Sequence, residues 1–460
     1  MSAVTQSRWH RFTRSDGLGA RIMRSSALTV VGYGGSQVLR LASNLILTRL
    51  LFPEAFGLMG LVWIFLVGLN NFSDIGINTS ILQNKRGDDA KFLDTAWSLQ
   101  IIRGVVLWMA TVALAVPAAQ FYDAPQLVEL LPVVGLTFLV QGLRPTRLDQ
   151  AQRHLKLGFV TVIDLGAQVI GLTVGVVFAW VTGSVWALVI NALTTNVMQL
   201  LFYTLFLPGH RNRLGWEKAA LRDLLQFGSW IFLATVAGFL LAQGDKIVLG
   251  KYLSLNALGI YTIGYFLASF PLMLGGVVVR RILIPVYRDR PPAESLENFK
   301  QLQKLRFSVS ASLFVLLSIV AFAGVLLVQV LYDSRYELAG GVVVLLSVMQ
   351  IPMVIVLTYD QAALASGDSR RFFVLAGCRA ALMLSGLLIG VIGYGLVGAL
   401  VGQGVAMVLA YPVVVWLSRH QGSWDPLHDA VFACAGLGLG AAAIWLNVDA
   451  IHALTALNLP

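Results

Sequence analysis

Charged residues are scarce in this chain of 460 residues. Asp, Glu, Lys and Arg make up 12% of the sequence, and hydrophobic residues make up 57%. An average soluble domain carries roughly 25% charged residues. Because a single soluble core cannot bury this much apolar surface, the composition excludes an ordinary soluble domain.

Cysteine is nearly absent as well. Cys378 and Cys434 lie far apart in apolar windows and do not have the spacing of a metal site or a redox pair. We interpret both as packing residues, and we predict neither a bound metal nor another cofactor. The sequence also shows no cleavable signal peptide, because the first apolar window starts near Ser26 without a cleavage motif. The first helix is therefore expected to stay in place as an anchor.

Apolar windows of about 18 to 25 residues recur along the whole chain, the length that a helix needs to cross a membrane. They predict an all-α polytopic membrane protein. The thirteen predicted spans are 26–49, 56–82, 95–119, 127–146, 158–181, 185–207, 225–249, 257–281, 307–331, 338–364, 372–393, 397–417 and 428–446.

Basic residues alternate between the two sides of these spans. Of the 33 Lys and Arg residues, 26 fall in the loops of one side, among them Arg144 and Arg306, and only three fall in the loops of the other side. Cytoplasmic loops hold most of the positive charge in membrane proteins. The N-terminus is thus predicted to be inside. The net charge of +10 is attributed to topology rather than to a nucleic-acid partner.

The predicted outer loops are only a few residues long. Membrane enzymes that polymerise or ligate polysaccharides usually carry catalytic acids or a sugar-binding domain in a large outer loop. No pair of carboxylates suited to acid–base catalysis is visible in these loops. The sequence therefore predicts a protein that is not an enzyme.

An internal repeat occurs at an offset of 202 residues. LILTRLLFPEAFGL (45–58) aligns with IVLGKYLSLNALGI (247–260). The offset spans six predicted helices, an even number, so both halves have the same orientation in the membrane. We predict two six-helix lobes and about one extra helix. The boundaries are a basic cytoplasmic segment at 1–25, an N-lobe at 26–207, a cytoplasmic linker at 208–223, a C-lobe at 224–417 and the extra helix at 428–446.

A polar stripe follows one face of the first predicted helix. Gln37, Arg40 and Asn44 are spaced by three and four residues, and Arg40 lies near the middle of the span. A charge at this depth usually faces the protein interior or water. We favour a wet cavity over the alternative, a seam of hydrogen bonds between helices. Because a guanidinium group grips phosphate or carboxylate well, this stripe is a candidate substrate-binding site.

Other charged residues within the spans allow two interpretations. Arg103 and Arg379 are further candidates for binding an anionic substrate, and Asp74, Asp164 and Asp360 are candidates for charge pairing or ion coupling. Several of them lie at similar depth, counted at about 1.5 Å per residue. They are therefore also candidates for structural ion pairs between helices.

Two segments resemble a known transporter family. The first carries a motif made of Arg49, Pro53, Phe56, Gly57, Phe72, Asp74, Gly76, Ile81, Leu82 and Gln83, and GDKIVLGKYLSLNALGIY (244–261) looks like its second-half counterpart. This pattern resembles that of the Wzx-like oligosaccharide-lipid flippases of the multidrug/oligosaccharidyl-lipid/polysaccharide superfamily. The resemblance is clearest over residues 27–105 and 225–265.

The resemblance implies a transporter of the bacterial cytoplasmic membrane that flips a polyprenyl-pyrophosphate-linked oligosaccharide, for export of exopolysaccharide or O-antigen-type polysaccharide. It implies two lobes that open alternately to each side. Basic side chains, first Arg40 and then Arg103 and Arg379, would hold the pyrophosphate, with Asp74 orienting or neutralising Arg103. Polysaccharide polymerases and glycosyltransferases are implied as partners, and the choice between proton and sodium coupling stays open.

Two other functions are weighed against this one. A multidrug or cation antiporter of the same superfamily would use a buried acid for proton or sodium exchange, which the stripe around Arg40 disfavours. An enzyme of polysaccharide assembly is disfavoured by the short outer loops.

Overall fold

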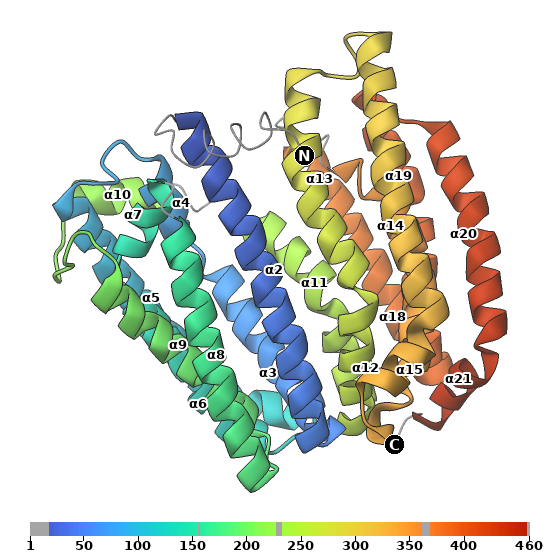
Figure 1. The fold of residues 1–460 in the computed structure, drawn as a ribbon, viewed down its shortest axis with the longest axis horizontal. Helices are drawn as coiled ribbons and strands as arrows, with labels where there is room; N and C mark the ends of the chain where they lie inside the picture. Colours follow the sequence, from blue (N-terminus) through green and yellow to red (C-terminus); the bar gives the residue numbers. More distant parts are fainter. Residues whose placement is uncertain (1–17, 155–156, 227–231, 361–368, 458–460) are drawn as a thin grey trace, which may run out of the picture. The chain divides into compact units, whose positions relative to one another are not determined.

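The structure is a computed structural model that describes residues 18–154, 157–226, 232–360 and 369–457. Every regular element in these ranges is a helix (Figure 1). A helix satisfies its own backbone hydrogen bonds, as a segment inside a membrane must. Within the described ranges, eight helices are long and apolar enough to cross a membrane, or nine if one pair bent by 62° is a single span. The predicted all-α polytopic membrane protein is confirmed. Residues 1–17 of the predicted segment 1–25 lie outside the described residues.

The first of two compact units contains the described residues of Met1–Leu51, Phe72–Gln120 and Pro125–Trp230. Its helices are α2 (Leu18–Leu50), α4 (Ile77–Gln83), α5 (Ala90–Phe121), α6 (Leu127–Gly142), α7 (Arg147–Arg153), α8 (Leu157–Thr182), α9 (Trp186–Phe206) and α10 (Lys218–Gln226). Small residues let the long helices approach closely. A Cβ at Gly32 in α2 would overlap Thr161 in α8, and one at Gly171 in α8 would overlap Thr195 in α9.

The second unit contains the described residues of Phe52–Asn71, Phe121–Ala124 and Ile231–Pro460. Its α-helices are α3 (Pro53–Phe72), α11 (Phe232–Tyr252), α12 (Leu255–Ala268), α13 (Phe270–Asp289), α14 (Leu296–Leu331), α15 (Ala339–Met349), α16 (Ile351–Val356), α18 (Ser369–Leu409), α19 (Tyr411–His420), α20 (Pro426–Leu446) and α21 (Val448–Ala453). Two short 3₁₀ helices lie at Ser334–Tyr336 and Leu454–Leu457. The predicted N-lobe 26–207 includes α3, whereas the contacts of α3 place it in this unit. The lobe boundaries stay a prediction.

The internal repeat is visible in the helix boundaries. Helix α2 ends at Leu50 and α11 at Tyr252, whereas α3 begins at Pro53 and α12 at Leu255. Both pairs of boundaries differ by the 202 residues that separate the repeated sequences. The repeated sequences thus form the same helix–turn–helix twice, which confirms the repeat.

Equivalent residues of the two copies meet where α3 crosses α12. A Cβ at Gly57 would overlap the carbonyl oxygen of Leu255, and a Cβ at Gly259 would overlap the carbonyl oxygen of Pro53. The repeat relates Gly57 to Gly259 and Pro53 to Leu255, so the two contacts are equivalent. Each copy supplies the glycine that accommodates the backbone of the other copy, which explains why a residue without a side chain is needed at both positions.

Two polar contacts fix the start of α12 near this crossing. The Asn256 side chain donates a hydrogen bond to Glu54 Oε1 over 2.8 Å. The Ser254 hydroxyl accepts a hydrogen bond from the backbone N–H of Ala257 and caps the helix. The first turn of α12 is thereby fixed to α3 and closed at its N-terminus.

Four predicted spans are broken, each near a residue that interrupts a helix; one of them, 397–417, breaks before α19, which carries Pro412 in its first turn. The span 56–82 forms α3 and α4, because residues 73–76 leave the helix and Gly76 has a left-handed φ of 71°. The spans 257–281 and 338–364 break before α13 and α16, which carry Pro271 and Pro352 in their first turns. A proline lacks the N–H that would continue the preceding helix.

Helix α18 is a hairpin of two helices. Its backbone leaves the helical region at Tyr394 and Gly395, and the two arms then pack closely through glycine pairs. A Cβ at Gly386 would overlap the backbone of Gly402, and one at Gly390 would overlap that of Gly398. The predicted span 372–393 is therefore the first arm of α18, and the predicted span 397–417 covers the second arm and continues into α19.

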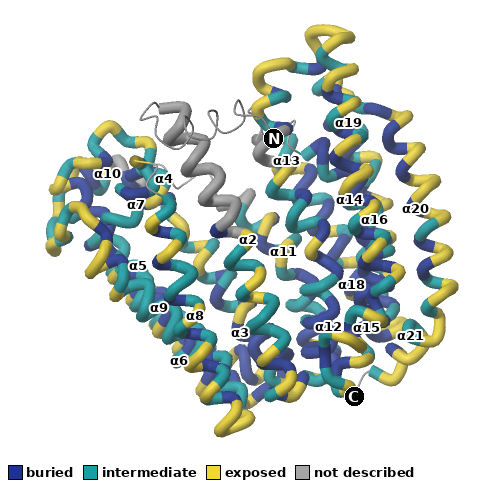
Figure 2. The backbone as a smooth tube through the Cα atoms, viewed as in Figure 1, coloured by how far each residue is buried: buried dark blue, intermediate teal, exposed yellow. Residues whose placement is uncertain are grey.

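Large apolar side chains remain exposed on the long helices, and Figure 2 colours many residues of α20 as exposed. Trp180, Ile389, Leu437 and Trp445 are each more than 70% exposed. Apolar surface of this extent is unfavourable in water and favourable in lipid. The exposure fits a protein whose helices face the bilayer.

Candidate functional site

The polar stripe of α2 lies beside its packing surface. Arg40 Nη1 donates a hydrogen bond to Gln37 Oε1 over 3.2 Å, and the Arg40 side chain is exposed. Asn44 is half-buried. The contact of α2 with α8 uses other residues, including Ser36, which accepts a hydrogen bond from Gln168 over 2.8 Å. The structure thus brings Gln37 and Arg40 together on the helix that packs against α8.

Arg103 meets the break between α3 and α4. Its Nε donates to the Ser73 hydroxyl over 3.0 Å, and the Asp74 carboxylate is close enough to act on it electrostatically. Asp74, predicted inside the continuous helical span 56–82, is not helical. It lies in the non-helical turn, exposed, and accepts the backbone N–H of Gly76 over 2.9 Å. A short polar side chain that holds its own turn in this way favours the break over a continuous helix.

Asp164 belongs to a polar network between α8 and α9. It accepts hydrogen bonds from the Gln199 amide, over 3.0 Å, and from the Tyr203 hydroxyl. Arg144 joins this network through Asn196 over 3.0 Å and through Gln199. Arg144, counted in a cytoplasmic loop from the sequence, is half-buried here. The network links the end of α6 to both helices and neutralises a carboxylate that lies in an apolar segment.

Arg379 and Asp360 form an ion pair in the second unit. Arg379 Nη1 lies 2.8 Å from both carboxylate oxygens of Asp360. The Arg379 side chain is only 5% exposed and that of Asp360 15%. This carboxylate already neutralises Arg379, so a substrate phosphate would have to compete with it. The role of Arg379 in substrate binding stays a prediction.

The contribution of this pair to stability can be measured with single and double variants. Asp360→Asn should lower the stability of the protein by on the order of 3 kcal/mol, because it leaves a buried guanidinium without its counter-charge. The double variant Asp360→Asn/Arg379→Met should recover most of this loss. Thermal unfolding of the purified proteins in detergent checks both expectations. A double variant as unstable as Asp360→Asn would contradict the ion pair as the cause.

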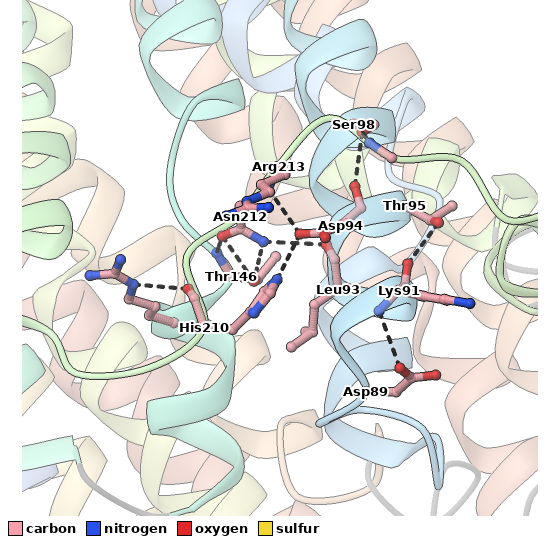
Figure 3. A network of polar contacts seen from close by, with 12 residues as sticks. Asp89, Lys91, Leu93, Asp94, Thr95, Ser98, Thr146, His210, Asn212 and Arg213 are labelled. Atoms are coloured by element: carbon pink, nitrogen blue, oxygen red, sulfur yellow. Dashed lines mark hydrogen bonds and ion pairs between the residues drawn. The ribbon is translucent and has the colours of Figure 1, made fainter.

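The predicted linker 208–223 contacts the first unit through many polar groups (Figure 3). Asp94 in α5 accepts hydrogen bonds from the His210 ring over 2.8 Å and from the Arg213 backbone over 2.9 Å. Asn212 Oδ1 accepts the backbone N–H of Thr146 over 3.0 Å. Figure 3 shows these contacts along the extended, non-helical segment of the linker. The linker is thus held along its length, rather than only at its two ends.

An ion pair joins the end of the linker to the loop between α4 and α5. Arg86 lies 2.7 Å from Glu217 and 2.5 Å from Asp89. The hydrogen bond from Arg86 lowers the pKa of Asp89 below its usual value. The interaction of Asp89 with Arg86 therefore stabilises the folded protein at pH values above the usual pKa of an aspartate. This stabilisation is lost only as the pH falls through the lowered pKa of Asp89.

Loss of the Asp94 contacts should loosen the linker. Asp94→Ala removes the acceptor for His210 and Arg213, and we expect faster trypsin cleavage at the exposed Arg211 and Arg213. Limited proteolysis followed by mass spectrometry of the fragments measures the rate. Asp333→Ala, which changes a half-buried carboxylate in a loop of the second unit, is the control. Equal cleavage of the two variants would show that Asp94 does not hold the linker.

Sequence reasoning missed two buried clusters in the second unit. Arg306, expected in a cytoplasmic loop, is wholly buried in α14, so that expectation is wrong. It lies in one cluster with His428 and Asp429 of α20. In another cluster, Asp245 accepts a hydrogen bond from Tyr261, and Lys246 Nζ lies 3.7 Å from Asp245. Each cluster contains two residues that are neighbours in the sequence, but their remaining contacts, such as those of Asp245 with Tyr261 and of His428 with Ser310, arise only on folding.

A metal centre has no candidate within the part of the chain that the structure describes, where no three His, Cys, Asp or Glu side chains are grouped as ligands.

Comparisons with known proteins point to one family. The pattern of a family described as polysaccharide biosynthesis protein matches residues 46–361, well over half of the chain. Teichuronic acid biosynthesis protein TuaB of Bacillus subtilis (strain 168) is 22% identical over 299 residues, which are 64% of this chain and 61% of TuaB. Lipopolysaccharide biosynthesis protein WzxC of Escherichia coli (strain K12) is 23% identical over 270 residues, 58% of this chain and 54% of WzxC. The match therefore spans less than two thirds of the length of these two relatives.

Solved structures show the same fold. The lipid II flippase MurJ in an inward closed conformation superposes with a TM-score of 0.70 at 11% identity, over 94% of this chain and 98% of MurJ. An inward-facing multidrug resistance MATE family transporter of the MOP superfamily superposes with a TM-score of 0.62 at 16% identity, over 84% of this chain and 94% of the transporter chain. At such identities the likeness concerns the fold alone. With its predicted motifs, helices and repeat, the chain belongs to the polysaccharide biosynthesis protein family and has the two-lobe helical fold of the MOP superfamily transporters.

Proposed function

We propose that this protein flips a polyprenyl-pyrophosphate-linked oligosaccharide from the inner to the outer leaflet of a bacterial cytoplasmic membrane by alternating access. The N-terminus lies in the cytoplasm, and the chain has no enzymatic activity. The polysaccharide named in the relatives' descriptions and the lipid flippase among the structural neighbours support this substrate class. Glycosyltransferases that build the lipid-linked unit and a polymerase that uses it are the partners that this function requires.

The exposure of Arg40 is the observation that carries the proposal. Arg40 lies ten residues before the end of α2 at Leu50, about 15 Å along the helix axis. An arginine exposed at this depth would be costly in hydrocarbon, so it belongs on a water-filled path. Its guanidinium, held by Gln37, can grip a pyrophosphate with parallel hydrogen bonds. An apolar drug or a simple cation would gain nothing from this group.

Transport can be tested directly in proteoliposomes. The purified protein is reconstituted with a fluorescent polyprenyl-pyrophosphate-linked oligosaccharide, and arrival in the outer leaflet is followed with an impermeant quencher or a lectin. In cells, deletion of the gene should cause lipid-linked repeat units to accumulate in the inner leaflet and stop export of polymer. Normal export in the deletion strain would refute the proposal. A deletion strain with altered drug sensitivity alone would instead support the antiporter.

The predicted lobes put α3 in the N-lobe and α12 in the C-lobe, so alternating access of these lobes predicts that the crossing of α3 and α12 opens during transport. Cysteines introduced as Glu54→Cys and Asn256→Cys, in a protein with Cys378 and Cys434 replaced by serine, should react with a short bifunctional thiol reagent, because the native side chains form a hydrogen bond. Cross-linking should arrest transport, whereas either single cysteine variant treated in the same way should stay active. Full transport by the cross-linked protein would show that this crossing stays closed throughout the cycle.

A further inference from the structure

Two large apolar side chains of the linker are exposed. Leu214 is 76% exposed and Trp216 is 56% exposed. Both lie in the non-helical segment between α9 and α10, outside the long apolar helices of the first unit. Exposed apolar side chains that lie close together mark a surface that contacts another molecule or a membrane. The structure around this segment indicates which of the two it contacts.

Alternate backbone N–H groups attach this segment to the start of α5. The acceptors are side-chain oxygens of α5: Asp94 Oδ1 for Arg213 over 2.9 Å, the Ser98 hydroxyl for Gly215 over 3.0 Å and the Thr95 hydroxyl for Glu217 over 3.0 Å. Figure 3 shows the segment running beside the helix that carries these acceptors. Successive side chains of an extended chain point to opposite faces. Leu214 and Trp216, two residues apart, therefore share one face of the segment.

The segment covers one end of an apolar stripe of α5. Asp94 and Ser98, which hold the segment, are four residues apart and lie on one face of α5. The same face continues with apolar side chains at helical spacing, each between 39% and 51% exposed: Ile102, Val105, Met109, Val112 and Val116. Such a stripe on a membrane-spanning helix faces lipid. It begins one turn beyond Ser98, about 6 Å along the axis. The exposed linker side chains therefore lie at the edge of the lipid-facing surface.

Exposed basic residues flank the two apolar side chains. Arg211, Arg213, Leu214, Trp216 and Lys218, all exposed, form what we call the linker patch. The one acid within residues 211–218 is Glu217, which lies 2.7 Å from Arg86 and is neutralised by it. Long basic side chains can cover apolar surface with their stems while their charges stay at the headgroups. The linker patch thus combines an apolar pair with an excess of positive charge.

This combination fits a membrane surface better than a protein surface. Tryptophan is enriched at the boundary between membrane and water, where its ring contacts both. Basic segments next to a membrane are attracted to anionic lipids. A protein partner could also contact an apolar pair with flanking charges. However, the position at the end of the lipid-facing stripe brings Leu214 and Trp216 next to the acyl chains. The observations therefore favour a lipid.

We propose that the linker patch is a binding site for an anionic phospholipid of the adjacent leaflet, which is the cytoplasmic leaflet in the proposed topology. The two apolar side chains contact the acyl chains below the headgroup, and the three basic side chains bind its phosphate. The bound lipid holds the linker against α5, in addition to the contacts of Asp94. The site lies outside the residues proposed to bind the substrate, and it does not depend on flippase activity.

The first test is protection of the linker from trypsin, which cleaves after Arg211 and Arg213. The purified full-length protein in a neutral detergent is titrated with phosphatidylglycerol, phosphatidylcholine or inorganic phosphate. Phosphatidylglycerol should slow cleavage at these two sites, whereas the other two compounds should have little effect. Inorganic phosphate that protects as well as phosphatidylglycerol would show a simple anion site and would overturn the proposal. Absence of protection by phosphatidylglycerol would overturn it as well.

Variants of exposed residues that keep both cleavage sites test the role of the apolar pair. Leu214→Ser/Trp216→Ser should need roughly tenfold more phosphatidylglycerol for the same protection, because it loses the contact with the acyl chains. Lys300→Gln/Lys304→Gln, which removes two exposed cations of α14, should be protected like the wild type. Unchanged protection of Leu214→Ser/Trp216→Ser would show that the apolar pair does not bind the lipid.

The second test uses protein in lipid nanodiscs. A fluorophore is attached at Ala219→Cys, an exposed position beside the linker patch, in a protein with Cys378 and Cys434 replaced by serine. Phosphatidylglycerol with brominated chains should quench it more strongly than brominated phosphatidylcholine at the same molar fraction. Arg211→Gln/Arg213→Gln should abolish this difference. Equal quenching by the two lipids with the native linker patch would overturn the proposal. Absence of quenching by either lipid would also overturn it and would favour a protein partner.

Discussion

Replacing Arg40 with alanine is expected to reduce transport of the lipid-linked oligosaccharide by a factor of ten or more, while the protein still reaches the membrane. A hydrogen bond from a charged donor contributes roughly 1.5–3 kcal/mol, and about 1.4 kcal/mol corresponds to a factor of ten. Loss of the guanidinium removes at least one such bond to the pyrophosphate. Outer-leaflet appearance of the labelled substrate in proteoliposomes measures the effect, with protein amounts matched by immunoblot.

The controls separate the charge of Arg40 from the general effect of a change in α2. Arg40→Lys keeps the positive charge but not the planar, bidentate geometry, so it should retain part of the activity. Arg49→Ala removes an exposed cation from the last turn of the same helix and should reduce transport far less. If Arg40→Ala transports normally, Arg40 is not the pyrophosphate site, and Arg103 becomes the leading candidate in the first unit.

Replacing Gly57 with valine is expected to prevent the crossing of α3 and α12 from forming. Even the Cβ of an alanine would overlap the carbonyl oxygen of Leu255, a backbone atom that cannot move aside as a flexible side chain can. Overpacking a core costs typically about 1–3 kcal/mol, and a clash with backbone lies at the upper end. We expect a lower yield of folded protein and a lower melting temperature. Fluorescence-detected size-exclusion chromatography after heating measures both.

The internal symmetry supplies the matched variants for this prediction. Gly259→Val should act like Gly57→Val, because its Cβ would overlap the carbonyl oxygen of Pro53 in the equivalent contact. Gly60→Ala is the control within α3, since its Cβ would lie 3.4 Å from the Thr262 hydroxyl oxygen, near ordinary contact distance. A Gly57 variant as stable as Gly60→Ala would mean that the two helices can separate without loss of stability.

The candidate site was predictable in part. The stripe of Gln37, Arg40 and Asn44 follows from helical periodicity alone, because residues three and four apart share one face. The hydrogen bond between Gln37 and Arg40 is such a local contact. The partner of Arg379 could not be read from the sequence with the same certainty. Depth along a helix restricts the residues that could pair with Arg379, but the rotation of each helix about its axis decides which side chains meet.

The sequence by itself determined that this protein is a helical membrane protein with a repeat, because span length, apolar composition and a 202-residue offset are properties of the chain that need no contacts. The residues at the breaks, Gly76, Pro271 and Pro352, act on their own backbone, but the spans that contain them were predicted as continuous. Only the tertiary structure decided that Arg306, Ser310 and His428 form one cluster. His428 lies 118 residues after Ser310 in the sequence, and these groups come together only when α14 and α20 pack against each other.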